Sequence, residues 1–228
     1  MITLTSIYNP KTRFLVIDIE TTKPKQGEKT GSIFDIGFAI FSRKDGIIGE
    51  QGYILKENKD LIPYYADRLK RYDEYLATGE YLIKPFVQIM DIIDRLCKKY
   101  NVEYVTAYNL QFDKDTYIDK LCERYGIQSP LKNLKTFCIW QGACETLGQR
   151  KSFKDFVDSN KFLKPNTNNR MSGAEIMYRY MINEPDFEEE HTGLADIRIE
   201  IELLDRILRQ KKKMSKTYGN GAWRLVQG

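Results

Sequence analysis

The sequence predicts an α/β domain in which a mixed five-stranded sheet is flanked by helices. Three β-rich runs come first and are joined by short turns, which is typical of consecutive antiparallel strands. Helical periodicity then alternates with two more β-rich runs, which is typical of strands covered by helices. The chain has 228 residues, a length that single domains reach. We therefore expect one domain over residues 1–228, with its core at 14–208 and a basic C-terminal tail at 209–228.

The first half of the chain supplies three strands and two helical segments. The predicted strands are Phe14–Glu20, Ile33–Phe41 and Gly46–Leu55. The first is an apolar run that ends in acidic residues and Thr-Thr, as expected of a buried central strand that leaves the sheet. A polar, helix-rich stretch near Ala66–Thr78 and a helix at Phe86–Tyr100 follow.

The second half predicts a strand at Glu103–Tyr108, a helix at Asp113–Gly126 and a strand at Leu134–Cys138. An irregular helical region then extends to residue 183. The last helix carries an apolar stripe at i, i+4, i+7 and i+11, formed by Ile197, Ile201, Leu204 and Leu208. The polar, Pro-containing and Asn-rich loop 161–170 is the best candidate for a mobile segment that faces a substrate.

Asp18 and Glu20 stand two residues apart on the first strand and therefore point to the same face. Carboxylates held side by side repel, and such pairs are usually tolerated because a divalent cation lies between them. The alternative is an acidic strand end that faces water. The Asp-x-Glu pattern recurs at Asp186 and Glu188, but in a charged loop without an apolar run, and we interpret that pair as solvated.

A third carboxylate, Asp113, opens the predicted helix after the fourth strand. Tyr117, Leu121 and Tyr125 follow at intervals of four residues, which places Asp113 on the inward face of the first turn. The alternative is that Asp113 is an N-cap that serves its own backbone amides and faces outward.

His191 is the only histidine of the chain and comes five residues before Asp196. Five residues rotate an α-helix by roughly 140°, so the two side chains could not share a face if both lay in the helix. We therefore expect His191 in the preceding loop and Asp196 in the first turns of the last helix. A lone histidine is also compatible with a structural or an exposed role.

Taken in this order, the motifs resemble those of the DEDDh exonucleases, proofreading-type 3'-5' exonucleases of the ribonuclease H-like superfamily. The resemblance covers residues 14–208 and is nearest in style to compact phage-type exodeoxyribonucleases. The chain departs from many relatives at Tyr108, where they have histidine, and in 134–138, where they often place an aspartate before the threonine. The residues that carry the resemblance are Asp18-Ile-Glu20-Thr21-Thr22, Ile36-Gly37, Asn109-x-x-Phe112-Asp113 and His191-x-x-x-x-Asp196.

The resemblance implies a ribonuclease H-like fold and two-metal-ion hydrolysis of phosphodiesters at single-stranded DNA ends, with release of nucleoside 5'-monophosphates. Four carboxylates would hold two Mg²⁺ or Mn²⁺ ions, which prefer oxygen ligands. Asp18 would bridge both ions, Glu20 and Asp196 would complete the site nearer the nucleophile, and Asp113 would act through metal-bound water. His191 would take the proton from the attacking water.

The resemblance also implies contacts with the terminal nucleotide from the Thr21 backbone amide and from Thr22, Asn109 and Phe112. Three alternatives remain for the activity. A related 3'-5' exoribonuclease would prefer RNA ends, a catalytically silent module would bind nucleic acid without cleaving it, and an endonuclease of the same superfamily would cut closed circles.

Charge and composition favour a nucleic-acid partner. The formal net charge is only +4, but basic segments at 23–31 and 209–216 flank the acidic centre. Each segment is also compatible with a solvated loop or helix end.

Four cysteines without a C-x-x-C spacing and a single histidine favour reduced thiols over zinc. No apolar run approaches the roughly 20 residues of a membrane span, and the N-terminus lacks a signal-peptide layout. We expect a cytoplasmic protein without a membrane partner.

Overall fold

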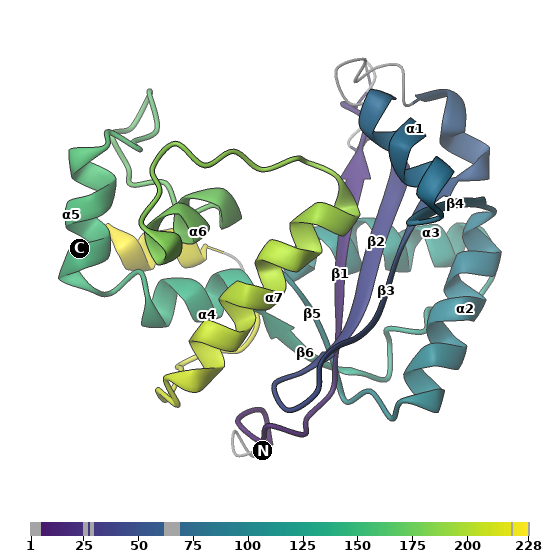
Figure 1. Ribbon diagram of the computed structural model, residues 1–228, viewed down its shortest axis with the longest axis horizontal. Helices are drawn as coiled ribbons and strands as arrows, with labels where there is room; N and C mark the ends of the chain where they lie inside the picture. Colours follow the sequence, from purple (N-terminus) through teal and green to yellow (C-terminus); the bar gives the residue numbers. More distant parts are fainter. Residues whose placement is uncertain (1–5, 25–26, 28–29, 62–68, 220, 228) are drawn as a thin grey trace.

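A computed structural model describes residues 6–24, 27, 30–61, 69–219 and 221–227. Within these residues one sheet with strand order β4-β3-β2-β1-β5-β6 has helices on both faces (Figure 1). The strands are β1 (Phe14–Thr21), β2 (Ile33–Ser42), β3 (Gly46–Leu55), β4 (Tyr81–Lys84), β5 (Tyr104–Ala107) and β6 (Lys135–Cys138). The helices are α1 (Leu69–Thr78), α2 (Phe86–Lys99), η2 (Gln111–Ile118), α3 (Asp119–Arg124), α4 (Ile139–Thr146), α5 (Lys151–Ser159), α6 (Ala174–Ile182), α7 (Gly193–Arg209) and η3 (Ala222–Val226).

The predicted mixed sheet is confirmed, but the prediction of five strands was wrong because the sheet has six. β2 is antiparallel to β1 and β3, whereas β4, β5 and β6 are parallel to their neighbours β3, β1 and β5. The additional strand β4 is an edge strand of four residues in which Tyr81 is buried while Leu82 and Ile83 are exposed. So short a run shows no alternation over several residues, which is the signal that identifies a half-buried strand from sequence.

Side chains alternate between two apolar layers along β1. Leu15 and Ile17 pack into the layer that contains α2 and α3, whereas Phe14 and Val16 pack into the layer that contains α4, α5, α6 and α7. Because strand side chains alternate in direction, Asp18 and Glu20 continue the face of Phe14 and Val16. Both carboxylates therefore point to the side of the sheet that α7 covers (Figure 1).

The helix expected at residues 113–126 differs from the prediction. It begins with the π-helix η2 at Gln111, in which backbone hydrogen bonds span five residues, and continues as the short helix α3 to Arg124. Asp113 and Tyr117 are buried as predicted, but Leu121 is only partly buried and Tyr125 is 43% exposed. The extra residue per turn in η2 rotates the later positions out of the i+4 stripe, which is why Tyr125 lies at the surface.

α7 approaches the sheet at a pair of glycines. The stripe Ile197, Ile201, Leu204 and Leu208 is buried as predicted. A Cβ atom on Gly37 of β2 would lie 2.2 Å from the carbonyl carbon of Gly193, the first residue of α7. The backbones of β2 and α7 can therefore be in direct contact here only because neither Gly37 nor Gly193 has a side chain.

We expect Gly37→Ala to destabilise the fold by about 1–3 kcal/mol, because the methyl group meets backbone atoms that cannot rotate away. Gly49→Ala on β3 is the matched control, since a Cβ there meets nothing within 4 Å. Urea unfolding of the two variants and the wild type measures the difference. Equal stability of the Gly37 variant and the control would contradict the backbone contact.

The chain after α7 packs against the domain. Met214, Ala222 and Val226 are buried, and the Cys138 amide donates to the Thr217 carbonyl at 2.7 Å. The lysines at 211, 212, 213 and 216 are nevertheless exposed, so this basic segment presents its charges on a fixed backbone.

The loop 161–170, which was predicted to face a substrate, is held at its end by Arg170. This side chain binds Asp158 and the carbonyls of Val226 and Gln227. The contact of the loop with a substrate stays a prediction.

Within the expected basic loop 23–31, residues 25, 26, 28 and 29 lie outside the described residues, as do residues 66–68 of the expected helical stretch. All four cysteines are free and buried. Across the described ranges, no helix is both long enough and apolar enough to cross a membrane.

Candidate active site

An acidic cavity of about 200 Å³ lies where β1, η2 and α7 meet. Asp18 of β1, Asp113 of η2 and Asp196 of α7 line it. Glu20 lies beside this cavity. One carboxylate oxygen of Glu20, one carboxylate oxygen of Asp196 and one ring nitrogen of His191 lie within 4.8 Å of one another. The structure thus brings together all five residues that the sequence singled out as catalytic; their roles stay predictions.

Asp113 is a lining residue of the cavity and not a helix cap. Its side chain is only 4% exposed, and the N-cap position of η2 belongs to Leu110. The backbone amides of Ile19 and of Asp113 itself hydrogen-bond to the carboxylate and lower its pKa, but burial outweighs them and raises the pKa to about 7. The inward orientation predicted from the sequence is confirmed, and the alternative of an outward-facing cap was wrong.

His191 lies in the loop before α7, as predicted. Its backbone is left-handed, with a φ of 54°, and its side chain is 49% exposed. Thr192 is the N-cap of α7, and its hydroxyl accepts a hydrogen bond from the Ala195 amide. Asp196 lies in the first turn of the helix. The imidazole can therefore change rotamer at the solvent boundary while Asp196 stays on a regular helix.

Asp35 fixes the start of α7 to the sheet. Its Oδ2 atom accepts hydrogen bonds from the Gly193 amide at 2.9 Å and from the hydroxyls of Tyr72 and Tyr81 at 2.7 and 3.0 Å. The Leu194 amide donates in turn to the Tyr81 hydroxyl at 2.9 Å. A carboxylate at a helix N-terminus also stabilises the helix dipole. This buried network places Asp196 opposite the two carboxylates of β1.

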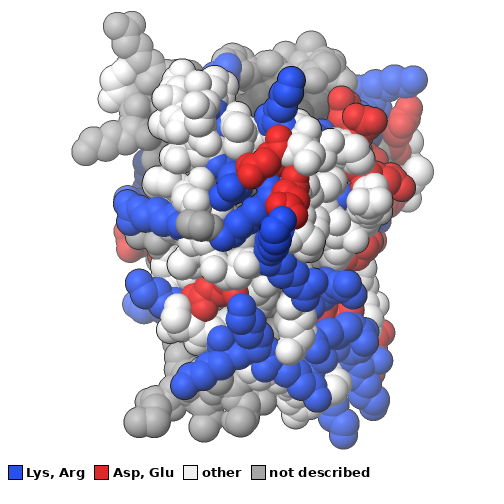
Figure 2. Space-filling view, turned by 90° about the vertical axis from the view of Figure 1, so that its left-hand side faces the viewer, with Lys and Arg blue, Asp and Glu red and all other residues white. Residues whose placement is uncertain are grey.

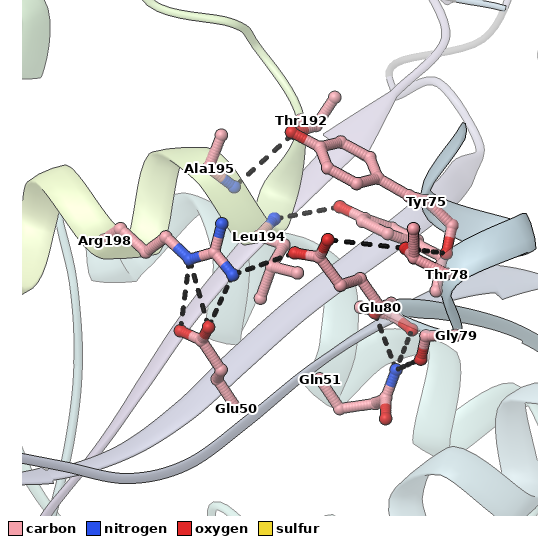
Figure 3. Close-up of polar contacts among 12 residues, drawn as sticks. Glu50, Gln51, Tyr75, Thr78, Gly79, Glu80, Thr192, Leu194, Ala195 and Arg198 are labelled. Carbon is pink, nitrogen blue, oxygen red and sulfur yellow. Dashed lines mark hydrogen bonds and ion pairs between the residues drawn. The ribbon is translucent and has the colours of Figure 1, made fainter. Parts of the chain in front are cut away.

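An ion-pair network, one helical turn beyond Gly193, also holds α7 against the sheet. The Arg198 guanidinium binds Glu50 of β3 at 2.5 Å and Glu80 at 3.0 Å (Figure 3). Figure 3 also shows Gln51 of β3, whose side-chain amide donates to the carbonyls of Gly79 and Glu80. The first turns of α7 are thus connected to both the centre and the β4 edge of the sheet.

Two further carboxylates, which the sequence interpretation did not single out, also line the cavity. Glu200 is 2% exposed, and Glu189 lies in the loop before His191 with its Oε2 atom 3.8 Å from His191 Nδ1. Glu200 could have been found, because it follows Asp196 by four residues and therefore lies on the same helix face. Glu189 could not be distinguished from its neighbours in the acidic loop. Asp186 and Glu188 of that loop are exposed, as predicted.

The carboxylates disfavour one another's ionisation. Burial raises the pKa of Asp18 well above its ordinary value, and the charges of Asp113 and Glu200 add to the effect. Burial likewise raises the pKa of Glu200, with Asp113 as the next largest cause, and raises the pKa of Glu189 to about 7. No lysine or arginine lines the cavity among the described residues. Among the described residues, Arg179 lowers the pKa of Glu189 from outside the cavity, but burial outweighs this effect.

The donor set fits divalent cations. Among the described residues, the Oδ2 atom of Asp18 and the Oε2 atom of Glu200 are shielded from solvent and have no hydrogen-bond partner. Oxygen atoms left in this state are costly unless a cation or a proton binds them. A site composed of carboxylate oxygens suits Mg²⁺ or Mn²⁺.

The expected substrate contacts fall into two groups. Asn109 and Phe112 line the cavity at its rim, and both are exposed, Phe112 by 37%. Thr21 and Thr22 are half-buried and are absent from the residues that line the cavity. Thr22 instead closes the turn after β1, because its amide donates to the Ser32 carbonyl and its hydroxyl accepts from the Ser32 amide, both at 2.9 Å.

A larger groove of about 670 Å³ begins on the other side of Tyr117. Tyr117 contacts Phe112 with 4.7 Å between ring centroids, and its hydroxyl accepts a hydrogen bond from the Gly31 amide. Exposed Lys120 and Arg124 line this groove. Basic side chains also gather on the face formed by the α4–α6 half of the protein, mostly in its lower part (Figure 2). Cationic side chains therefore lie both in this groove and on that face of the molecule.

No protein-family model and no curated protein matches the sequence. Solved structures do match. A 3'-exonuclease that recognises the 3' end of the histone mRNA stem-loop is 13% identical, with a TM-score of 0.58 over 89% of this chain and 84% of that chain. The nuclease domain of 3'hExo, a DEDDh family member bound to rAMP, is 13% identical, with a TM-score of 0.54 over 90% of this chain and 97% of that chain.

The zinc-bound form of E. coli exonuclease I with single-stranded DNA is 11% identical, with a TM-score of 0.56 over 88% of this chain and 41% of that chain. This chain thus spans less than half of that enzyme. The three likenesses show that the protein has the fold of DEDDh 3'-exonucleases, as the sequence motifs predicted. The expected absence of zinc stays a prediction.

We expect the metal-free protein to lose stability as the pH rises from about 4 to 7. The pKa of Asp113 and that of Glu189 are raised to about 7, so the folded state holds more protons than the unfolded chain throughout this interval. Each unit of pKa difference corresponds to about 1.4 kcal/mol, which makes the loss on the order of 3 kcal/mol for Asp113.

Thermal melting in EDTA over this pH interval measures the loss, and saturating Mg²⁺ or Mn²⁺ should reduce it. Asp113→Asn should reduce it as well, whereas Asp186→Asn in the exposed loop should leave it unchanged. A metal-free protein whose melting temperature does not fall with pH would contradict the proposed burial of these charges.

Proposed function

We propose that this protein is a metal-dependent 3'-5' exonuclease that removes nucleoside 5'-monophosphates from single-stranded DNA ends. The observation that carries the proposal is the convergence of carboxylates from β1, η2 and α7 on one cavity that contains no basic residue, beside a half-exposed histidine. The fold shared with 3'-exonucleases supports the same class of reaction.

Asp18, Glu20, Asp113 and Asp196 would hold two Mg²⁺ or Mn²⁺ ions. When bound, the ions would lower the pKa of water to give a hydroxide and stabilise the departing 3'-oxygen. Asp18 lines the cavity together with Asp113 of η2 and Asp196 of α7, and it would contribute to both ions. The rigid attachment of α7 through Asp35 fixes the position of Asp196 relative to β1.

His191 would take the proton from the attacking water. It lies half-exposed on the chain that enters α7, within reach of Glu20 and Asp196. The Glu189 carboxylate, 3.8 Å from Nδ1, would stabilise the imidazolium that forms.

The terminal nucleotide would meet the Thr21 backbone amide and the turn closed by Thr22. Phe112 offers an exposed ring at the rim for stacking on a base, and Asn109 offers an amide for hydrogen bonding. Lys120 and Arg124 in the neighbouring groove would contact backbone phosphates.

The test is a 5'-labelled single-stranded DNA oligonucleotide incubated with Mg²⁺, with Mn²⁺ and with EDTA. We expect a ladder of products shortened from the 3' end in both metals and no products in EDTA. A covalently closed single-stranded circle should resist cleavage. Cutting of the circle would identify an endonuclease, and tight binding without cleavage of either substrate would identify a silent nucleic-acid-binding module.

We expect kcat/KM to be higher for a DNA end than for an RNA end of the same sequence. The sequence motifs are nearest to exodeoxyribonucleases, but of the matched proteins one recognises an RNA stem-loop and another is bound to single-stranded DNA. Discrimination depends on how the site receives the terminal 2'-hydroxyl, which can donate and accept hydrogen bonds. Matched oligonucleotides at one salt concentration measure the ratio. Faster removal of ribonucleotides would reverse the substrate assignment and leave the metal chemistry intact.

A further inference from the structure

Glu200 is a buried carboxylate with one satisfied and one unsatisfied oxygen. It lies on the face of α7 that carries Asp196 and is 2% exposed. Its Oε1 atom accepts a hydrogen bond from the Tyr108 amide at 3.0 Å, at the end of β5. Among the described residues, its Oε2 atom has neither a hydrogen-bond partner nor contact with solvent. The backbone contact restrains the side chain through Oε1, and the residue as a whole lines the acidic cavity.

The neighbours of Glu200 make its position costly without a cation. The side chain lines the acidic cavity together with Asp18 and Asp113. Of the charges that disfavour ionisation of Asp18, only that of Asp113 acts more strongly than that of Glu200. No lysine or arginine lines this cavity among the described residues. An ionised carboxylate in such a place is strongly disfavoured unless a positive charge accompanies it.

We propose that Glu200 is a fifth carboxylate of the metal site and holds, through Oε2, the divalent cation that Asp18 and Asp113 also bind. This inference rests on the proposed function, because it assigns an additional residue to the same centre. Glu200 adds negative charge to the cavity from a buried position, whereas His191 is half-exposed. The cation that Glu200 contacts would therefore be bound more tightly than four carboxylates alone would allow, since affinity for hard cations increases with the number of charged ligands.

Glu200→Gln tests this assignment with little change in shape. The glutamine carbonyl can still accept the hydrogen bond from the Tyr108 amide, while the side-chain amide replaces the oxygen that would bind the cation. Glu202→Gln is the matched control, because Glu202 lies on the same helix but is exposed and accepts a hydrogen bond from the Tyr178 hydroxyl. Circular dichroism and thermal melting in EDTA establish that both variants fold.

Mn²⁺ binding is measured by titration calorimetry and by electron paramagnetic resonance of free Mn²⁺, without any nucleic acid. We expect Glu200→Gln to weaken the tighter site about 10- to 100-fold and the control to match the wild type. Should Glu200→Gln unfold, Glu200→Asp keeps the charge, shortens the reach and is expected to weaken the same site. Unchanged Mn²⁺ affinity and stoichiometry in a folded Glu200→Gln variant overturn the proposal and identify Glu200 as a buried neutral acid.

The binding experiment is separate from the cleavage experiment, so the two proposals can fail separately. A wild-type protein that binds Mn²⁺ in a Glu200-dependent manner but cleaves no oligonucleotide would retain the metal site and overturn the exonuclease assignment. A protein that cleaves oligonucleotides and binds Mn²⁺ equally with and without Glu200 would retain the exonuclease and overturn the fifth ligand.

Discussion

Asp18→Ala should lower turnover by about 10⁴-fold or more, because Asp18 lies between η2 and α7 and would contact both ions on which the reaction depends. Glu20→Ala and Asp196→Ala should lower turnover nearly as much. The folded state should remain intact, and the melting temperature in EDTA should be equal to or higher than that of the wild type, since the substitution removes a charge from a crowded buried site.

The measurement is single-turnover cleavage of a labelled oligonucleotide in saturating Mn²⁺, with Glu188→Gln in the exposed acidic loop as the control for a lost charge. Wild-type cleavage by a folded Asp18→Ala variant would show that the chemistry takes place elsewhere. Loss of activity in the control as well would indicate an effect of net charge on substrate binding.

His191→Ala should lower the rate of the cleavage step by about 10²–10⁴-fold, the usual contribution of a positioned general base. Affinity for an oligonucleotide with a cleavage-resistant phosphorothioate end should change much less, because the carboxylates and the basic surfaces remain. The wild-type rate should rise with pH through the range in which imidazoles lose a proton, about pH 6.5 in model peptides, and the variant should lack this rise.

Stopped reactions over a series of pH values measure both effects. A His191→Ala variant with the wild-type rate would assign His191 to the loop alone. A variant that is slow but keeps the full pH dependence would assign the proton transfer to another group, for which Glu189, 3.8 Å from Nδ1, is a candidate.

Much of the fold could be predicted because most elements carry a strong local signal. The apolar runs of β1 and β2 and the buried stripe of α7 were identified to within one or two residues. β4 carries too few residues for a pattern, and its pairing with β3 depends on contacts distant in sequence. The π-helical start of η2 could not be predicted, because the spacing of apolar residues there also fits an ordinary α-helix.

The site was predictable for a different reason. Five of its residues lie in short motifs, and the order of these motifs along the chain is distinctive although each motif alone is not. Glu200 and Glu189 lie outside the motifs and became visible only through burial and distance. Spacing from Asp196 placed Glu200 on the correct helix face, but only the tertiary structure shows that this face is closed to solvent. Sequence patterns thus identified five residues that the structure brings together, but they missed two of the carboxylates that line the cavity.

The contact between Gly37 and Gly193 separates the site into a part that is fixed to the sheet and a part that lies in the preceding loop. Residues from Gly193 onward are fixed to the sheet through Asp35 and Arg198, and Asp196 therefore keeps its position relative to β1. His191 precedes this fixed point and belongs to the loop that arrives from α6. A ligand that displaced this loop would therefore move the imidazole while Asp18 and Asp196 kept their relative positions.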